Sequence, residues 1–273
     1  MSAQPSKTAL IGFGEAGSTF ARAGGWGQAG SAFDIAPQRR AVMEECGIAP
    51  AASAEEALKG AEVVLSLVTA DAALKVAQDY APFLALGAIW CDMNSVAPDT
   101  KRAAAQAVEA AGARYVDVAV MAPVNPAALH VPLLLSGADA QETEVKLYEL
   151  GFENARIAGQ DVGRASSIKM IRSVMVKGLE ALSSECAAAA DEAGVFEEVM
   201  ASLDASEKSL PWAERIAYNR ERMATHGERR AAEMEEAAKT LLDLGIEPVM
   251  TRGTVALQRR AAKSKKNERN EAA

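Results

Sequence analysis

The chain has 273 residues, which is enough for two domains and a substantial core. Hydrophobic residues make up 49% of the sequence and charged residues 24%, as is ordinary for a globular protein. The net charge of −8 disfavours nucleic acid as a partner, and no apolar stretch is long enough to span a membrane.

Three cysteines, Cys46, Cys91 and Cys186, are scattered along the chain. Their spacing matches neither a metal site nor a disulfide framework, so we expect no metal and a reducing compartment. The N-terminus runs almost directly into the first apolar run, which leaves no room for a signal peptide. These features predict a cytoplasmic protein.

A glycine-rich turn follows the first predicted strand. Gly12 permits a tight turn, the absent Cβ of Gly14 lets a pyrophosphate approach the backbone, and Gly17 lets the next helix pack closely on the strand. The N-terminus of that helix offers free N–H groups and the positive end of the helix dipole to phosphates. The turn therefore predicts a dinucleotide-binding site, to which we assign Gly12, Phe13, Gly14, Glu15, Ala16 and Gly17.

A carboxylate, Asp34, closes the second predicted strand, about twenty residues after the central glycine. At this position a carboxylate accepts hydrogen bonds from both ribose hydroxyls and repels a 2′-phosphate, so we expect NAD rather than NADP. Arg39 and Arg40 follow closely, and we interpret them as surface residues. Glu15 would repel a pyrophosphate, so we expect its side chain to point into solvent.

The first half of the chain alternates β-type runs with helical ones, which predicts an α/β fold with a doubly wound parallel sheet of Rossmann type. A capping box of Ser53 and Glu56 precedes one helix, and Pro98 starts a helix expected over residues 98–111. The predicted strands are Thr8–Ile11, Ser31–Asp34, Val63–Val68, Ala88–Asp92, Tyr115–Val120 and Val131–Ser136.

Two loops that follow predicted strands should lie at the carboxyl edge of the sheet, where open α/β sheets bind ligands. Val68 and Thr69 in the first loop, and Asn94 in the second, are predicted to contact the cofactor. Ser95, next to Asn94, is predicted to contact the substrate.

The pattern changes after residue 162, and only helices are predicted there. A long helical stretch covers Ala165–Ala193, Pro211 and Gly227 punctuate the following helices, and Gly245 is expected to cap one of them. We predict a dinucleotide-binding domain over residues 1–162 and an all-helical domain over residues 163–273. The helical domain carries more apolar surface than so small a domain can cover, which predicts a homodimer.

Lys169 lies at the start of the long helix, where a cleft between a cofactor domain and a substrate domain would form. At helical spacing it shares a face with Ser173, and Arg172 stands beside them. Partial burial and the like charge of Arg172 both lower the pKa of a lysine, which can then exchange a proton near neutral pH. The alternative is a lysine whose ammonium group extends into solvent.

Together these features resemble the β-hydroxyacid dehydrogenase family, which includes 6-phosphogluconate and 3-hydroxyisobutyrate dehydrogenases. The resemblance spans most of the chain and rests on the glycine turn and on segments 68–71, 92–98, 117–120 and 163–173. It implies a Rossmann domain, an interdomain helix and a helical domain, with Lys169 as the catalytic acid/base. Segments 226–234 and 245–248 resemble a branch with its own C-terminal helical domain.

Two departures from the family pattern concern the substrate. The family's substrate loop usually carries serine and glycine where this chain has Met121, Ala122 and Pro123, and proline has no N–H to donate. We therefore expect a more apolar substrate pocket at Met121 and Ala122, or an anion held elsewhere. The family's asparagine after the lysine is replaced by Ser173, which can still bond a hydroxyl, and Arg172 can pair with a carboxylate.

The sequence thus predicts an NAD(H)-dependent oxidoreductase that moves a hydride between the nicotinamide and a hydroxy-acid-like alcohol. Lys169 would take the hydroxyl proton, and His226 is a further candidate for substrate contact. Two alternatives remain open. An imine reductase shares the architecture, although such enzymes typically replace the lysine. A non-catalytic dinucleotide sensor would bind a protein through its helical domain or nucleic acid through the basic tail at residues 259–269.

Overall fold

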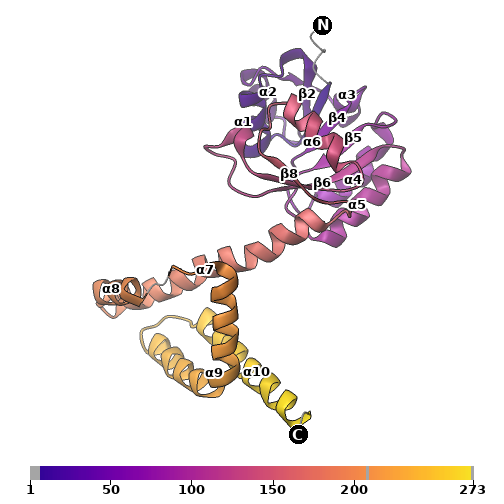
Figure 1. Cartoon of the computed structure of the whole chain (residues 1–273). Coiled ribbons are helices and arrows are strands. Elements are labelled where there is room, and N and C mark those ends of the chain that lie inside the picture. The colour runs from indigo at the N-terminus through magenta and orange to yellow at the C-terminus, as the bar shows by residue number, and fades with distance from the viewer. Residues whose placement is uncertain (1–6, 207–208, 272–273) are drawn as a thin grey trace. The chain divides into compact units, whose positions relative to one another are not determined.

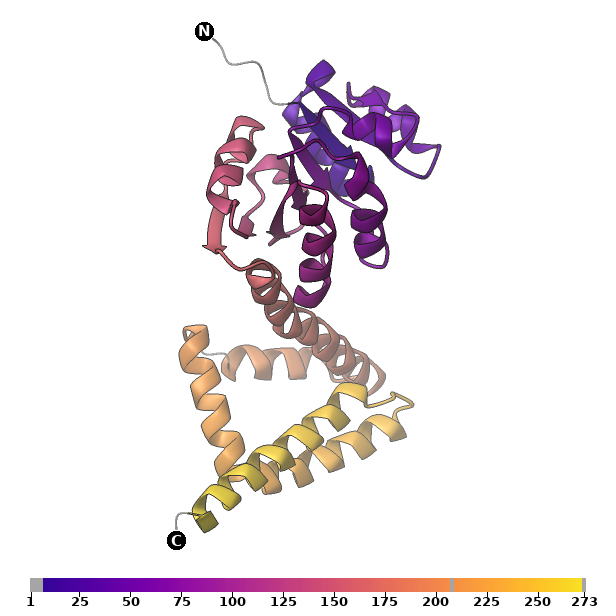
Figure 2. The same cartoon turned by 90° about the vertical axis from the view of Figure 1, so that its right-hand side faces the viewer.

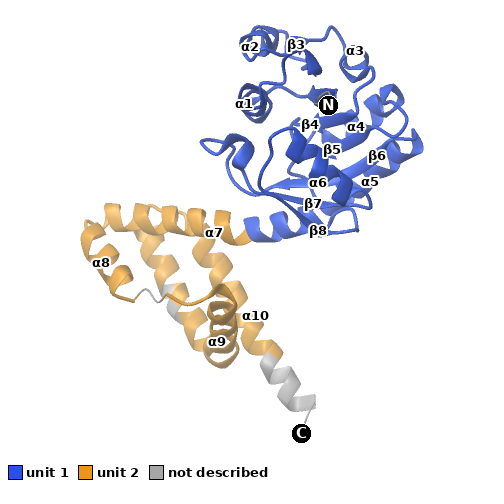
Figure 3. Cartoon of the chain, turned by 45° about the horizontal axis from the view of Figure 1, so that its top comes forward, with its two compact units in different colours: residues 1–173 blue, residues 174–273 orange. Residues whose placement is uncertain are grey.

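The structure, a computed structural model, describes residues 7–206 and 209–271. The chain divides into two compact units, residues 1–173 (unit 1) and residues 174–273 (unit 2), coloured separately in Figure 3. The division falls within one long helix, after Ser173. The placing of the functional domain boundary at residue 162 stays a prediction.

Unit 1 is built on an eight-stranded sheet (Figure 1). The strand order is β3-β2-β1-β4-β5-β6-β7-β8, and every neighbouring pair is parallel except β6 and β7. The predicted Rossmann-type sheet is therefore confirmed, with one reversed strand. The strands are β1 (Thr8–Ile11), β2 (Gly30–Phe33), β3 (Ala49–Pro50), β4 (Val63–Ser66), β5 (Ile89–Asp92), β6 (Arg114–Val120), β7 (Leu133–Ser136) and β8 (Ala155–Gly159).

Helices cover both faces of the sheet because successive strand residues point to opposite sides. On β1, Ile11 packs with α3, α4 and α5, whereas Leu10 packs with α1 and α2. On β4, Leu65 shares a core with α1 and α6. The helices are α1 (Glu15–Gly24), α2 (Arg39–Glu45), α3 (Ala54–Leu58), α4 (Ala73–Tyr80), α5 (Pro98–Ala110) and α6 (Ala140–Glu149), with short 3-10 turns η1 (Gly27–Ala29), η2 (Ala81–Phe83) and η3 (Ala128–His130).

Two strands lie outside the predicted set. β3 has only two residues, one of them proline, and β8 has no buried residue, so neither carries a continuous apolar run. The six predicted strands all form, with ends shifted by up to two residues. The capping box also forms, because Ser53 Oγ accepts from the N–H of Glu56 at 3.1 Å, although the Glu56 carboxylate accepts from Ala52 rather than from Ser53.

Unit 2 is helical throughout its described residues. Helix α7 (Arg164–Glu192) continues into it from unit 1, and α8 (Phe196–Ser206), α9 (Trp212–Asp243) and α10 (Val249–Glu271) follow. Figure 2 shows α10 running alongside the second part of α9, which bends about midway. Gly245 adopts a φ of +76° just after α9, as a C-terminal cap requires.

The prediction that Gly227 separates two helices is wrong, because this residue lies inside α9. A Cβ on Gly227 would lie 2.3 Å from the carbonyl oxygen of Gln258 and 3.0 Å from Cβ of Ala262. The glycine is therefore needed for the close crossing of α9 and α10 rather than for a break in the chain.

Unit 2 buries few apolar side chains. In its described residues, no leucine, isoleucine, valine, methionine or aromatic side chain is buried, and the buried hydrophobic residues are Ala190 and Ala231. Large apolar side chains are exposed instead, among them Val174, Leu179, Leu203, Trp212 and Val249. A helical unit of this size ordinarily has a core of large side chains, so the exposed apolar faces are an unusual feature of unit 2.

Glu185 of α7 caps the start of α10. Its carboxylate accepts hydrogen bonds from the N–H groups of Met250 and Thr251, at 2.8 and 2.9 Å, and from the Thr251 hydroxyl at 2.6 Å. Burial raises the pKa of the Glu185 carboxyl, but these hydrogen bonds lower it more, so its net pKa lies below the usual value.

We expect this cap to make unit 2 sensitive to acid. Because the folded-state pKa is lowered, the stabilisation is fully present above the unfolded-state pKa and is lost as the pH falls through the folded-state pKa. Glu185→Gln should lower the free energy of unfolding by about 1 kcal/mol at neutral pH. It should also make the free energy of unfolding depend less on pH in the acidic range. Thermal unfolding followed by circular dichroism across an acidic pH series measures both effects. Glu180→Gln, at an exposed position of the same helix, serves as the control, and equal pH profiles for the two variants would contradict the cap.

Candidate functional site

The glycine turn has the geometry that its sequence predicts. Gly12 has a φ of +91°, and a Cβ there would lie 2.5 Å from the carbonyl oxygen of Leu67. A Cβ on Gly17 would lie 2.7 Å from the carbonyl oxygen of Gly12, so α1 packs tightly on the turn. A Cβ on Gly14 would meet nothing within 4 Å, and Gly14 caps α1 without a side-chain hydrogen bond. The open space at the start of α1 fits a pyrophosphate.

A cavity of about 260 Å³ adjoins this turn at the carboxyl ends of β1, β2 and β4. It contains the predicted residues Asp34, Val68 and Thr69. One wall of the cavity is apolar and includes Ala72, Val76 and Tyr80, which were not predicted to line the site. Their spacing of four residues places them on one face of a helix, and this pattern in the sequence could have identified them. The cavity is lined by Ile11, Gly12, Gly14, Phe33, Asp34, Ile35, Leu67, Val68, Thr69, Ala72, Val76 and Tyr80.

Asp34 is tied to the glycine turn. Its Oδ2 accepts from the N–H of Phe13 at 2.7 Å and its Oδ1 from the N–H of Ala36 at 2.8 Å. The side chain of Phe13 is fully buried, so only its backbone reaches the site. Arg39, predicted to be a surface residue, is half-buried and donates from Nε to the carbonyl oxygen of Phe13 at 2.5 Å. The Asp34 carboxylate and the Arg39 guanidinium therefore both bond the backbone of Phe13, and Asp34 also lines the cavity.

Glu15 and Thr69 also have partners. Glu15 is exposed as predicted, yet its Oε1 accepts from Nδ2 of Asn125 at 2.9 Å, which joins the start of α1 to the connection between β6 and β7. The hydroxyl of Thr69 bonds the Asp71 carboxyl and lowers its pKa. Ala16, half-buried, packs its methyl group against the core.

The open space at Gly14 gives a direct test of the dinucleotide site. Gly14→Val should weaken NADH binding by about tenfold or more, because a branched side chain would occupy the space offered to the phosphates. Fluorescence titration with NADH measures the loss. The thermal midpoint should stay near that of the wild type, whereas Gly17→Ala should lower it. Undiminished NADH binding by a folded Gly14→Val variant would place the cofactor elsewhere.

A second group of polar side chains lies at the carboxyl ends of β4 and β5. Asn94 is only 5% exposed, and its Nδ2 donates to Ser66 Oγ at 3.0 Å and to Asp92 Oδ1 at 2.8 Å. Its Oδ1 has no hydrogen-bond partner among the described residues. A buried acceptor without a partner is costly, so it fits a donor on a bound ligand, in line with the predicted cofactor contact.

Lys169 reaches this group from α7. The half-buried lysine donates from Nζ to Ser95 Oγ at 2.5 Å, which joins the predicted acid/base to the predicted substrate residue. Ser173, one turn further on, is half-buried. Arg172 is exposed and donates to the carbonyl oxygen of Met121 at 3.4 Å. The two segments that depart from the family pattern, at Met121 and at Arg172, are therefore in contact.

Two further predicted substrate residues are Ala122 and His226. Ala122 is exposed in the connection after β6. His226 is exposed on α9 and belongs to unit 2. The role of both residues stays a prediction.

Beneath Asn94 lies a buried ion cluster, which we define as Asp92, Lys101 and Asp117. Lys101 Nζ lies 2.9 Å from Asp92 Oδ1 and 3.4 Å from Asp117 Oδ1, and all three side chains are at most 1% exposed. Tyr115 donates to Asp92 Oδ2 at 2.6 Å, and burial followed by the Asp92 charge raises the pKa of that phenol. Sequence reasoning missed this cluster, although Lys101 shares the apolar face of α5 with Ala104, Ala105 and Val108.

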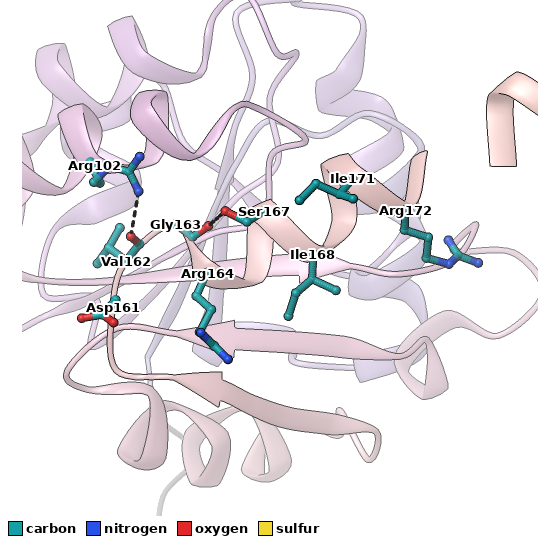
Figure 4. A pocket seen from close by; sticks show the side chains of 9 residues that line it. All are labelled: Arg102, Asp161, Val162, Gly163, Arg164, Ser167, Ile168, Ile171 and Arg172. Carbon is teal, nitrogen blue, oxygen red and sulfur yellow. Dashed lines mark hydrogen bonds between the residues drawn. The ribbon is translucent and has the colours of Figure 1, made fainter. Parts of the chain in front are cut away.

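A larger cavity of about 660 Å³ surrounds the start of α7 but does not include Lys169, Ser95 or Asn94. Figure 4 shows the side chains of Arg102, Arg164 and Arg172 pointing in different directions from it. Arg164 donates to the carbonyl oxygen of Ala158 at 2.6 Å and Arg102 to that of Val162 at 3.4 Å. Because the arginines do not converge, this cavity lacks the geometry of an anion site.

Other kinds of site find less support. Burial raises the pKa of the Cys91 thiol to about 12, so this cysteine is no thiolate nucleophile. In the part of the chain that the structure describes, no three histidine, cysteine or acidic side chains gather to hold a metal ion. Within the same residues, no helix combines the length and apolarity needed to cross a membrane.

The chain is similar to several proteins of known structure. A conserved hypothetical protein from Sinorhizobium meliloti 1021 is 38% identical over 96% of this chain and 90% of that chain, with a TM-score of 0.63. A conserved protein whose structure is described as similar to 3-hydroxyacid dehydrogenases is 29% identical over 94% of this chain and 96% of that one, with a TM-score of 0.62. An imine reductase from Myxococcus stipitatus in complex with NADP⁺ shares the fold, with a TM-score of 0.74, 17% identity and 94% of each chain covered.

Family models match both units. A model described as a domain of unknown function (DUF1932) matches residues 190–261, within the helical unit. The model described as the NAD binding domain of 6-phosphogluconate dehydrogenase matches residues 7–147, which is more than half of the chain and includes the glycine turn, Asp34 and Asn94. The chain therefore belongs to the family that carries the NAD binding domain of 6-phosphogluconate dehydrogenase.

Proposed function

We propose that this protein is an NAD(H)-dependent oxidoreductase that acts on a hydroxy-acid-like alcohol or on the corresponding carbonyl compound. The observation that carries the proposal is the 2.5 Å contact between Lys169 Nζ and Ser95 Oγ, beside the unpartnered Oδ1 of Asn94. A lysine, a hydroxyl and a free acceptor at the carboxyl edge of a dinucleotide-binding sheet are the groups that alcohol oxidation requires.

Lys169 is the acid/base in this proposal. When bound, a nicotinamide dinucleotide accepts or supplies the hydride. In oxidation, neutral Lys169 Nζ takes the proton of the substrate hydroxyl, and in reduction the ammonium returns it. Ser95 and Ser173 orient the reacting oxygen by hydrogen bonds, and Arg172 offers its guanidinium to a carboxylate on the substrate.

The choice of NAD over NADP is also part of the proposal. It is supported by Asp34, whose carboxylate stands at the ribose position and would repel a 2′-phosphate. Arg39 stands close by and is the residue that would favour such a phosphate. Among proteins with this fold, one Myxococcus stipitatus imine reductase structure is a complex with NADP⁺, and a V8 variant is a complex with NAD⁺.

The experiment is a screen of 3-hydroxy acids, sugar acids and aromatic alcohols with NAD and NADP, followed by absorbance of the reduced nicotinamide. Turnover of an alcohol with NAD is the expected result. Cyclic imines are included, and reduction of an imine without oxidation of any alcohol would reassign the protein as an imine reductase. Dinucleotide binding without turnover of any compound would favour a sensor. The free cysteines Cys46, Cys91 and Cys186 support a cytoplasmic setting.

We further propose that two copies of the chain associate through unit 2. The support is the exposed apolar surface of this unit, since none of its large hydrophobic side chains is buried in the described residues. A second copy presents the same surface, and a two-fold interface lets identical apolar faces cover each other.

Leu179 on α7 offers a test of this association. It is 44% exposed, and Leu179→Glu should convert a dimer to a monomer because a charge would be buried in the interface. Sedimentation velocity measures the change. Lys177→Glu, at an exposed polar position of the same helix, should leave the dimer intact. A monomeric wild-type protein at high concentration would overturn the proposal.

A further inference from the structure

The buried ion cluster joins elements that lie far apart in the sequence. Asp92 ends β5, Asp117 lies within β6, and Lys101 extends from α5 between the two carboxylates. Lys101 Nζ also donates to the carbonyl oxygen of Asp92 at 2.6 Å. Removing three charged groups from water is expensive unless each is paired, so the cluster holds these elements in one arrangement.

One side of the cluster fixes the start of α7. Asp117 Oδ2 accepts from the N–H of Ser166 at 2.9 Å and from the hydroxyl of Ser136 at 3.2 Å. Ser136 Oγ in turn accepts from the N–H of Ala165 at 2.9 Å. The first N–H groups of a helix have no acceptor within the helix. Here the Asp117 carboxylate of β6 and the Ser136 hydroxyl of β7 serve as their acceptors. Lys169 follows one turn later on the same helix.

The other side of the cluster fixes the turn that carries Ser95. Asp92 Oδ1 accepts from the backbone N–H of Asn94 at 2.9 Å and from its side-chain amide at 2.8 Å, as in an Asx turn. Ser95 is the next residue. The two partners of the 2.5 Å contact, Lys169 and Ser95, therefore both stand on backbone held by the same buried charges.

We infer that Asp92, Lys101 and Asp117 are positioning residues that set the approach of Lys169 Nζ to Ser95 Oγ. This inference rests on the proposed function, in which that pair handles the proton of the substrate. Lys101 connects the two carboxylates, and Ser136 relays the position of Asp117 to the first turn of α7. None of these four side chains is exposed to a bound substrate, since each is at most 1% exposed.

Two buried serines, Ser136 at the end of β7 and Ser166 in the first turn of α7, provide a matched test. Ser136 and Ser166 are both buried, but the Ser166 hydroxyl donates only to the carbonyl oxygen of Gly163, at 3.0 Å, and does not touch the cluster. Ser136→Ala removes the link from Asp117 to Ala165 and leaves the direct hydrogen bond between Asp117 and the N–H of Ser166, whereas Ser166→Ala removes a buried hydroxyl of the same size that does not touch the cluster. The readout is competitive acylation of the protein with trace acetic anhydride over a pH series. Mass spectrometry compares Lys169 with the exposed Lys75 as internal reference.

In Ser136→Ala, we expect the labelling of Lys169 relative to Lys75 to rise about fivefold across the pH series, as the loss of one hydrogen bond implies. Ser166→Ala should keep the wild-type profile. A rise in both variants, or in neither, overturns the inference. If Ser136→Ala does not fold, Ser136→Cys keeps the volume with a weaker hydrogen bond and should give a smaller rise. The assay uses neither substrate nor cofactor, so it gives its answer even if the proposed reaction is wrong.

Discussion

Lys169→Ala is expected to lower turnover by about 10²- to 10⁴-fold, which is the range that positioned general acids and bases contribute. The lysine is the group in contact with Ser95 at the carboxyl edge of the sheet. NADH binding should be unchanged, because the glycine turn and Asp34 lie in a cavity that does not include Lys169. Turnover is measured with the alcohol identified in the screen, and NADH affinity by fluorescence titration.

Lys177→Ala provides the matched control, since Lys177 is an exposed lysine on the same helix. It should keep wild-type turnover. If Lys169→Ala also kept full turnover while binding NADH, the proton would have to be carried by another group, and the proposed mechanism would fail.

Lys101→Met is expected to destabilise unit 1 by about 3–5 kcal/mol, because it leaves the carboxylates of Asp92 and Asp117 buried without their counter-ion. Methionine has a similar volume, so the loss reflects charge rather than a cavity. Urea unfolding followed by tryptophan fluorescence measures it, since Trp90 lies in the same sheet.

The control for this prediction is Lys75→Met. Lys75 also pairs with a carboxylate, Asp79 at 2.7 Å, but both side chains are exposed to water, so Lys75→Met should leave the urea midpoint close to that of the wild type. Equal stability of the Lys101→Met and wild-type proteins would show that the two buried carboxylates do not depend on Lys101.

The fold could be predicted at positions where a local steric or burial requirement leaves a pattern in the sequence. Gly12 and Gly17 were found because a Cβ at either position would collide with backbone, and the apolar run at Val63–Ser66 was found because both faces of β4 are buried. β3 and β8 were missed because a two-residue strand and a strand without a buried residue carry no periodic signal. The reversed direction of β7 depends on pairing across the sheet, which no local pattern encodes.

The residues of the candidate site could be predicted where a local motif marks them and could not where only tertiary contacts do. Lys169, Ser95 and Asn94 stand at motif positions, and the structure brings them to one edge of the sheet. Lys101 was missed because a lysine in a helix is usually solvated, and only the apolar face that it shares with Val108 distinguishes it. Arg39 was assigned to the surface because its partner, the carbonyl oxygen of Phe13, lies on a distant segment.

The antiparallel strand β7 has a consequence for how this chain can change. A parallel neighbour of β6 would need a crossover helix, whereas the reversed β7 allows residues 121–132 to return directly at the ligand edge of the sheet. The connection carries Met121 and Ala122, and Asn125 and Pro126 in its middle are exposed, whereas Leu129 and Val131 near its end are buried in the core. Changes of length and composition around this exposed middle can therefore be accepted while β6, β7 and the buried end of the connection stay in place.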